Sequence, residues 1–194
     1  PNHFKDADVV MLGNLHPIVQ TGVLNQMTQK PKLVVLDTMN FWMDIAMEQL
    51  KKTISLVDVL TINDEEARQL SGEYSLINAS KKIQAMGPKY LIIKKGEHGA
   101  LLFHGTEMFF APALPLELVK DPTGAGDTFA GGFIGYLAKT RDLSFENMKR
   151  AVITGSALAS FCVEEMGTEK MFNISKEAIE NRLQQFSKLT NFSF

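Results

Sequence analysis

Residues 121–133 read DPTGAGDTFAGGF, and this segment constrains the fold and the chemistry of the chain most strongly. Three small residues, Gly124, Ala125 and Gly126, are followed by an acid, Asp127, and then by an apolar run with helical spacing. Glycines let backbone N–H groups approach an anion closely, and a helix start adds positive dipole character. The segment therefore predicts a phosphate-binding turn at a helix start, with Asp127 within reach of a reacting hydroxyl.

A glycine-rich loop in which Asp127 only caps a helix is the structural alternative, because Asp is a favoured N-cap residue. The length and order of the pattern favour the phosphate site. A dinucleotide-binding oxidoreductase does not fit the context. Its Gly-x-Gly-x-x-Gly pattern follows an early strand, and here the third glycine is replaced by Phe129.

Composition bounds the class of protein. The 194 residues are 45% hydrophobic and 22% charged, which is an ordinary globular composition with enough apolar residues for one core. The formal net charge is -2 and no long basic run is present, so neither nucleic acid nor a membrane is an expected partner. The single cysteine, Cys162, excludes an internal disulfide framework. It fits a reducing compartment, and we expect a cytoplasmic protein.

Short apolar runs alternate with helical patterns, which predicts an α/β fold with a largely parallel sheet. Strands are expected at 9–12, 33–36, 57–62, 90–93, 100–103 and 108–111. Helices are expected at 18–27, 43–53, 63–70, 76–86, 128–138, 145–162 and 176–187. No repeat or linker interrupts the chain, so residues 1–194 are expected to form one domain.

The segment at 121–133 resembles the C-terminal signature of the ribokinase-like family, the phosphofructokinase-B type carbohydrate kinases. That signature runs approximately Asp-(Pro/Thr)-x-Gly-Ala-Gly-Asp-x-x-x-(Gly/Ala)-Gly, and every position is filled here. The resemblance implies that the backbone of Gly124, Ala125 and Gly126, with the Asp127 amide, forms an anion hole at a helix start. It also implies that Asp127 is the catalytic base toward the hydroxyl of the substrate.

Polar residues follow two of the expected strands, and ligands of open α/β sheets gather outside the carboxyl ends of strands. Asn63 and Glu66 are three residues apart, so they face the same way in a first helical turn. The family has an Asn-x-x-Glu motif at this place, which implies that Asn63 lies near the nucleotide phosphates. Glu66 would then hold Mg²⁺ through water. The resemblance also implies that Asp37 and Asn40 lie near the phosphates and the metal.

Residues 94–100 read KKGEHGA and resemble a strand-end loop of the family, of the form (Thr/Lys)-x-Gly-x-x-Gly. In the family this loop lies beside the phosphates and the ribose of the nucleotide. The resemblance implies that Lys94 meets a phosphate and that Gly96 and Gly99 permit a close approach of backbone to ligand. A hairpin turn with solvated lysines is the structural alternative.

Asp121 and Thr123 resemble ligands of a monovalent cation site, usually for K⁺, which a second loop completes in the family. The corresponding loop is 163–168 here. Glu164 and Glu165 depart from the Thr-(Arg/Lys)-x-Gly pattern of common relatives.

Two further features leave alternatives open. Small residues at 155–157 leave room for a flat adenine, and tight helix packing explains them equally well. Asn14 follows a strand and lines the substrate side in one interpretation, or serves only the turn in the other.

Family members are longer than this chain, which begins at Pro1 and reads from its first line as the middle of a protein. We therefore expect the C-terminal, nucleotide-binding portion of a three-layer ribokinase-like α/β protein, without the N-terminal region and the lid. Such a fragment is expected to be inactive alone, because the absent part supplies most of the sugar-binding surface. A homodimer through the lid region is a further expectation.

The resemblance implies ATP-dependent phosphorylation of a hydroxyl on a sugar or a sugar-like small molecule, with ATP, Mg²⁺ and possible K⁺ as ligands. A nucleoside or vitamin kinase of the same family is the first alternative. A nucleotide-binding domain that has lost catalysis is the second, and Asp127 and Glu66 argue against it.

Overall fold

The computed structural model describes residues 2–191. The chain divides into two compact units. The first contains the residues up to Lys94 together with Leu101–Met108, and the second contains Lys95–Ala100 and the residues from Phe109 onward. The organisation of residues 1–194 as one domain stays a prediction.

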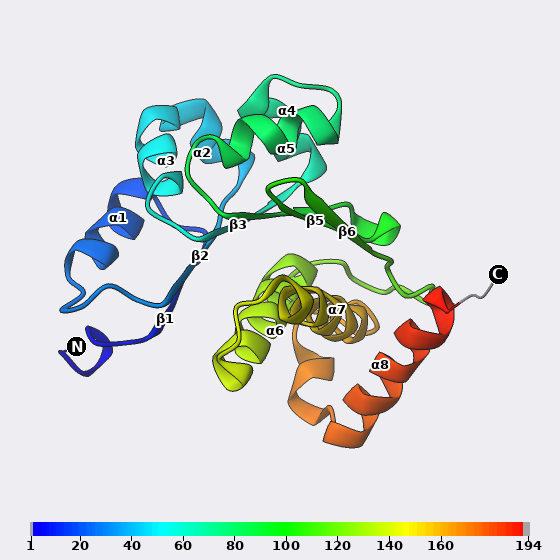
Figure 1. Cartoon of the computed structure of the whole chain (residues 1–194). Helices are drawn as coiled ribbons and strands as arrows, with labels where there is room; N and C mark the ends of the chain where they lie inside the picture. Colours follow the sequence, from blue (N-terminus) through cyan, green and yellow to red (C-terminus); the bar gives the residue numbers. More distant parts are fainter. Residues whose placement is uncertain (1, 192–194) are drawn as a thin grey trace. The chain divides into compact units, whose positions relative to one another are not determined.

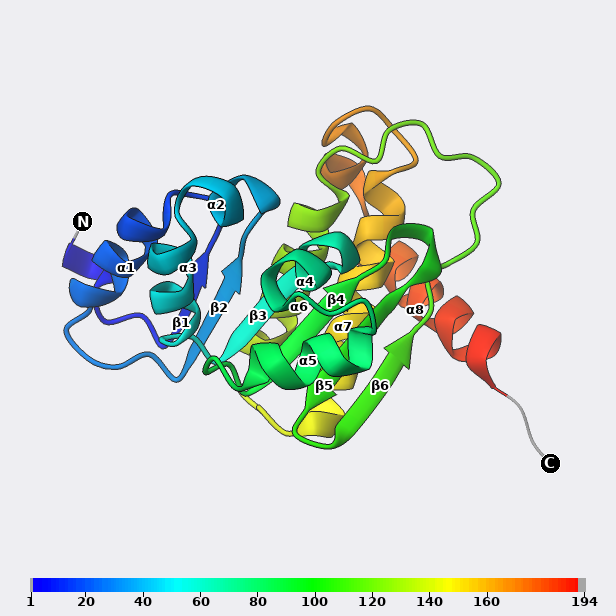
Figure 2. The ribbon, with the colours of Figure 1, turned by 90° about the horizontal axis from the view of Figure 1, so that it is seen from above.

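The first unit alternates strands and helices (Figure 1). Its elements are η1 (Asn2–Phe4), β1 (Val9–Leu12), α1 (Pro17–Asn25), β2 (Leu33–Asp37), α2 (Asn40–Ile45), α3 (Met47–Ile54), β3 (Val59–Asn63), α4 (Asp64–Ser71), α5 (Leu76–Gln84) and β4 (Tyr90–Lys94). Strands β1 to β4 lie side by side in sequence order and run parallel (Figure 2). The alternation that the sequence predicts is therefore present.

The helix expected at 43–53 is divided into α2 and α3. The break is at Ala46, whose φ of -145° lies outside the helical region. Neither Gly nor Pro occurs at this point of the sequence, so no helix-stop signal marked the break.

Strands β5 (Ala100–His104) and β6 (Glu107–Ala111) complete the sheet, whose order is β1-β2-β3-β4-β5-β6. The 3₁₀ helix η2 (Gly96–His98) precedes β5, and a two-residue turn joins β5 to β6. Connections this short join antiparallel neighbours only. The sheet is therefore mostly parallel, as the sequence predicts.

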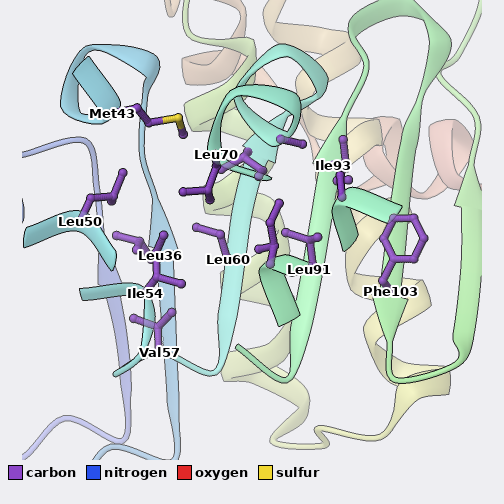
Figure 3. Close-up of a cluster of buried hydrophobic side chains, with 14 of the residues drawn as sticks. Leu36, Met43, Leu50, Ile54, Val57, Leu60, Leu70, Leu91, Ile93 and Phe103 are labelled. Atoms are coloured by element: carbon purple, nitrogen blue, oxygen red, sulfur yellow. The ribbon is translucent and has the colours of Figure 1, made fainter. Parts of the chain in front are cut away.

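The core of the first unit follows from the pleat of the strands. β2 is buried at all five positions, as a central parallel strand is expected to be. Leu36, Leu60 and Leu91 lie on the face of the sheet that the helices of the first unit cover (Figure 3). Because side chains alternate between faces, Asp37 and Lys94 project from the opposite face.

The second unit is mainly helical, with α6 (Ala125–Thr140), α7 (Phe145–Cys162), η3 (Glu169–Asn173) and α8 (Lys176–Thr190). Helices α6 and α7 approach closely. A Cβ atom at Gly155 would lie 2.6 Å from the Phe129 carbonyl oxygen. Tight packing therefore explains the glycine at 155, one of the two alternatives that the sequence left open. No helix within residues 2–191 is both long enough and apolar enough to cross a membrane.

Candidate functional site

Three polar residues of the first unit end neighbouring parallel strands. Asp37 ends β2, Asn63 ends β3 and Lys94 ends β4. The register places Asn63 opposite Lys94, and Asp37 opposite Thr61, two residues earlier along β3. The carboxyl edge of the sheet thus gathers three residues that lie far apart in the sequence, as expected for a ligand site of an α/β fold.

Lys94 and Asp37 form an ion pair across this edge. Lys94 Nζ lies 3.2 Å from Asp37 Oδ1 and 3.1 Å from Asp37 Oδ2. The Lys94 side chain is 20% exposed and the Asp37 side chain 8% exposed, so the pair is largely shielded from water. Asp37 Oδ1 also accepts a hydrogen bond from the Thr38 N–H. The sequence marked both members as candidates, but it did not pair them.

Asn63 and Glu66 close a capping box at the start of α4. Asn63 Oδ1 accepts from the Glu66 N–H, and Glu66 Oε2 accepts from the Asn63 N–H, each at 2.8 Å. Burial raises the pKa of the Glu66 carboxyl above its usual value. The Asn63 and Asn40 backbone N–H groups and the Lys94 ammonium partly oppose this rise, and the Asp37 carboxylate adds to it. Glu66 is thus electrostatically coupled to the ion pair.

The residues at this edge fit an Mg²⁺ ion that is also bound by nucleotide phosphates, and not one that is held by protein ligands alone. Mg²⁺ usually takes one or two carboxylates and keeps waters or phosphate oxygens for its remaining positions. Glu66 supplies one such carboxylate, whereas both oxygens of Asp37 already accept from Lys94. Within residues 2–191, no group of three or more His, Cys, Asp or Glu side chains is arranged to hold a metal ion. An all-protein metal cage is therefore not present in this part of the chain.

Two buried hydroxyl groups lie beside Asp37. The Oγ1 atoms of Thr38 and Thr61 are buried, and neither has a hydrogen-bond partner among the described residues. Thr38 follows Asp37 in the chain, and Thr61 is the register partner of Asp37. The sequence alone did not mark either residue, because a threonine inside an apolar strand (Thr61) or just after one (Thr38) is not distinctive by itself. Buried polar groups are usually hydrogen-bonded, so these hydroxyls have unused bonding capacity next to the candidate site.

The small-residue turn of the second unit begins helix α6. Gly124 is the N-cap, with a φ of 80° in the left-handed region that favours glycine. Asp127 lies in the first helical turn and is exposed. The Ala125 N–H donates to the Pro122 carbonyl at 3.1 Å. The first N–H groups of a helix have no partner inside it, so an anion at this turn would use the amides other than that of Ala125.

Asp121 connects the turn to the segment after α7. Its Oδ1 accepts from the Thr123 N–H at 2.9 Å, and its Oδ2 accepts from the Gly167 N–H at 3.2 Å. The side-chain and backbone hydrogen bonds of Thr123, and then that of Gly167, lower the pKa of the Asp121 carboxyl. Cys162 is fully buried beneath the same two segments. Its thiol lies 3.7 Å from the Thr123 carbonyl and 3.6 Å from the Gly167 carbonyl.

Glu164 and Glu165, the departures from the common family pattern, are both in ion pairs. Glu164 pairs with Arg182 at 2.7 Å and with Lys170 at 3.2 Å, and Glu165 pairs with Lys120. Burial raises the pKa of Glu164, but its hydrogen bonds with Arg182 and Lys170 outweigh burial and the net shift is downward. The acids therefore contribute to connections within the second unit.

The two glycines of the strand-end loop differ in their surroundings. Gly96 has a φ of 55°, and a Cβ atom there would meet nothing within 4 Å. Gly99 has a φ of 83°, and a Cβ atom there would lie 2.1 Å from the Ala111 carbonyl oxygen. The chain itself therefore requires Gly99, whereas the space beside Gly96 is open. The exposed His98 belongs to the turn η2.

Asn14 is held by neighbouring side chains of the first unit. Its Oδ1 accepts from Trp42 Nε1 at 2.7 Å, and its Nδ2 lies 2.9 Å from the Met39 sulfur. The ring of Trp42 in turn contacts those of His16 and Phe41 edge-on. These contacts give Asn14 a structural role in addition to its place at the end of β1.

The fold is that of the ribokinase-like kinases. The structure aligns with a ribokinase from Thermotoga maritima at a TM-score of 0.72 and 27% identity, covering 91% of this chain and 57% of the ribokinase chain. An aminoimidazole riboside kinase from Salmonella enterica, solved with aminoimidazole riboside and an ATP analogue, aligns at a TM-score of 0.76. Its identity is 20%, with 92% of this chain and 63% of the other covered, and this likeness supports the fold alone.

Residues 14–174 match the sequence model of the pfkB family of carbohydrate kinases. The chain therefore belongs to this family, as its small-residue signature predicts. A cytidine kinase from Thermococcus kodakarensis is 32% identical over 148 residues, which are 74% of this chain and 52% of the relative. The chain thus spans about half the length of this curated relative.

Proposed function

We propose that the protein to which this chain belongs transfers the γ-phosphoryl group of ATP to a hydroxyl of a sugar or nucleoside. The observation that carries the proposal is the start of α6, where the left-handed Gly124 opens the helix and the exposed Asp127 lies in its first turn. A helix start of this kind attracts an anion. An acid beside it is in the place where a hydroxyl must lose its proton for phosphoryl transfer.

Asp127 is the proposed base, and it accepts the proton of the attacking hydroxyl. The first-turn amides, Gly124 to Asp127 without that of Ala125, donate hydrogen bonds to the phosphoryl oxygens as their charge develops. Catalysis of this type depends mainly on positioning and electrostatic stabilisation. It needs no covalent intermediate on the chain, in agreement with a fully buried Cys162.

Glu66 is the proposed Mg²⁺ residue, acting through water. A bound Mg²⁺ ion supplies neutralisation of the negative phosphate oxygens. Asn63 fixes the Glu66 side chain through the capping box, in which Glu66 Oε2 accepts from the Asn63 N–H. Asn40 and Lys94 complete the residues of the first unit that we assign to the nucleotide, and Gly96 is the glycine of the loop beside open space.

A K⁺ ion at Asp121 and Thr123 is a secondary proposal. The observation in its favour is that Asp121 joins the turn to the loop at Gly167. Against it, both Asp121 oxygens already accept backbone hydrogen bonds, and Glu164 and Glu165 are paired within the chain.

Two substrate classes fit the comparisons. One relative of the chain is a cytidine kinase and one similar structure is that of a ribokinase, so a nucleoside and a free sugar are both supported. A coupled assay with ATP and Mg²⁺, over a panel of pentoses, hexoses and nucleosides, separates them in a preparation of the complete protein. Turnover that depends on one of these acceptors is expected. ATP binding without turnover on any acceptor would favour the alternative of a nucleotide-binding domain without catalysis.

A further inference from the structure

Asp37 is a poor direct partner for a nucleotide, although it lies at the candidate site. A carboxylate repels phosphate oxygens, and both Asp37 oxygens already accept hydrogen bonds from the Lys94 ammonium. Oδ1 has a further donor in the Thr38 N–H. With its side chain only 8% exposed, Asp37 has little surface to offer a ligand.

Lys94 has the opposite properties. Its ammonium carries three N–H donors, and the two Asp37 oxygens leave one of them for another acceptor. Its side chain is more exposed than that of Asp37, at 20%. The flexible four-carbon stem of a lysine costs conformational entropy whenever the charge is fixed in one place. An acid that already fixes the charge removes part of that cost from ligand binding.

The sheet explains why Asp37 can contact Lys94, although the two residues are far apart in the sequence. Asp37 and Lys94 end strands that lie on either side of β3, and both project from the face opposite the apolar core. The pair therefore spans the end of β3, where the Asn63–Glu66 capping box begins. Glu66 senses both charges, since the ammonium lowers the pKa of its carboxyl and the carboxylate raises it, while burial is the largest influence.

We infer that Asp37 is a positioning residue that acts through Lys94. It holds the Lys94 ammonium at the carboxyl edge of the sheet, ready for a nucleotide phosphate, and makes no contact with the nucleotide. This inference rests on the proposed function, because it assigns the phosphate contact to Lys94. It changes the role of Asp37 from a ligand-binding residue to the support of one.

The test compares the binding of ATP and adenosine to the 194-residue chain by NMR titration, which detects weak binding. Asp37→Asn removes the charge that fixes Lys94, and Lys94→Met removes the ammonium. Each is expected to weaken ATP binding roughly tenfold, the usual order for a charged hydrogen bond. Adenosine binding should be unchanged. The double variant should be no weaker than the weaker single variant, because both changes remove one interaction.

Asp58→Asn is the matched control. Asp58 also pairs with a lysine, Lys89, at 3.3 Å, but it does so just before β3 and β4 begin, at the other end of these strands. Its loss should leave the affinity for ATP unchanged. Asp37→Glu keeps the charge and serves if Asp37→Asn does not fold. It should bind ATP with an affinity between those of the wild type and Lys94→Met.

The outcomes distinguish a failure of the role inferred for Asp37 from a failure of nucleotide binding as a whole. An equal loss of ATP and adenosine binding in Asp37→Asn would make the pair merely structural and overturn the inference. So would wild-type affinity for ATP in Asp37→Asn while Lys94→Met is weakened, or an affinity in Asp37→Glu as low as that of Lys94→Met. Failure of the wild-type chain to bind either ligand would instead count against nucleotide binding itself, and the inference would fall with the proposed function.

Discussion

Glu66 and Asn63 each accept a hydrogen bond from the backbone N–H of the other at 2.8 Å, so the Asn-x-x-Glu motif is also the cap of helix α4. A structural role and a proposed metal-binding role thus share one side chain. A substitution that keeps the cap but removes the charge separates the two roles.

Glu66→Gln is that substitution, because a glutamine completes a capping box as well as a glutamate does. Folding stability should therefore change little, because the buried side chain keeps its shape and both hydrogen bonds of the capping box. The Mg²⁺ concentration for half-maximal activity should rise, since one carboxylate charge leaves the site. Urea unfolding and a magnesium titration of the active protein measure these effects.

Glu65→Gln is the control, because Glu65 is an exposed acid in the same helical turn. Its magnesium dependence should match that of the wild type. The same dependence in Glu66→Gln would show that Glu66 is only a cap.

Asp127→Asn should lower kcat by roughly 10²–10⁴-fold, the range for the loss of a general base. The affinity for ATP should change little, because the first-turn amides of α6 remain. Asp127 is exposed, so the fold should tolerate the change. Steady-state kinetics on the active protein measure kcat and the KM for ATP, and a near-normal kcat would remove Asp127 from the role of base.

Gly99→Ala should destabilise the chain by about 2–6 kcal/mol. Its positive φ of 83° with a ψ of -151° is strained for an L residue and costs about 1–3 kcal/mol, and overpacking against the Ala111 carbonyl adds about 1–3 kcal/mol. Gly96→Ala carries the first cost without the second, because its surroundings are open. Urea unfolding of both variants should rank Gly99→Ala as the more damaging, and equal losses would contradict the close contact at Ala111.

The lowered pKa of Asp121 predicts a pH-dependent stabilisation. In the folded chain the Thr123 hydrogen bonds, followed by that of Gly167, favour the charged carboxylate. They hold the pKa of Asp121 below its unfolded value of 3.8. Its contribution is therefore fully present above that value and is lost as the pH falls through the lower, folded-state pKa. The melting temperature of the wild type should exceed that of Asp121→Asn at neutral pH, and the difference should shrink in acid. A difference that stays constant with pH would contradict the assignment.

The 194-residue chain by itself should fold and bind adenine nucleotide weakly, without measurable phosphorylation of any acceptor. It spans about half the length of the curated relative that it matches. Correct positioning of a substrate can supply about 7–11 kcal/mol of barrier lowering, and we propose that the remaining length of such proteins provides it. Calorimetry with ATP analogues and a kinase assay on this chain test the two parts. Rapid sugar-dependent turnover would show that the chain is sufficient.

The sequence by itself determined the features that depend on near neighbours. Small residues followed by an acid predicted a helix start at this turn, although α6 begins at Ala125, three residues before the expected 128. Apolar runs with helical patterns between them predicted a mostly parallel sheet. The signature at 121–133 also identified the family correctly. The limits of α7 were predicted to the residue, because Ser144 caps its start through its side chain and helical spacing continues to Cys162.

Tertiary structure alone decided which residues meet. The pairing of Asp37 with Lys94 depends on the register of three strands that no local pattern encodes. The need for glycine at 99 depends on the Ala111 carbonyl, and the second backbone donor to Asp121 is Gly167, 46 positions further along the chain. Local periodicity records which face a side chain takes, whereas such contacts arise from the packing of distant segments, and that packing gives each candidate residue its role.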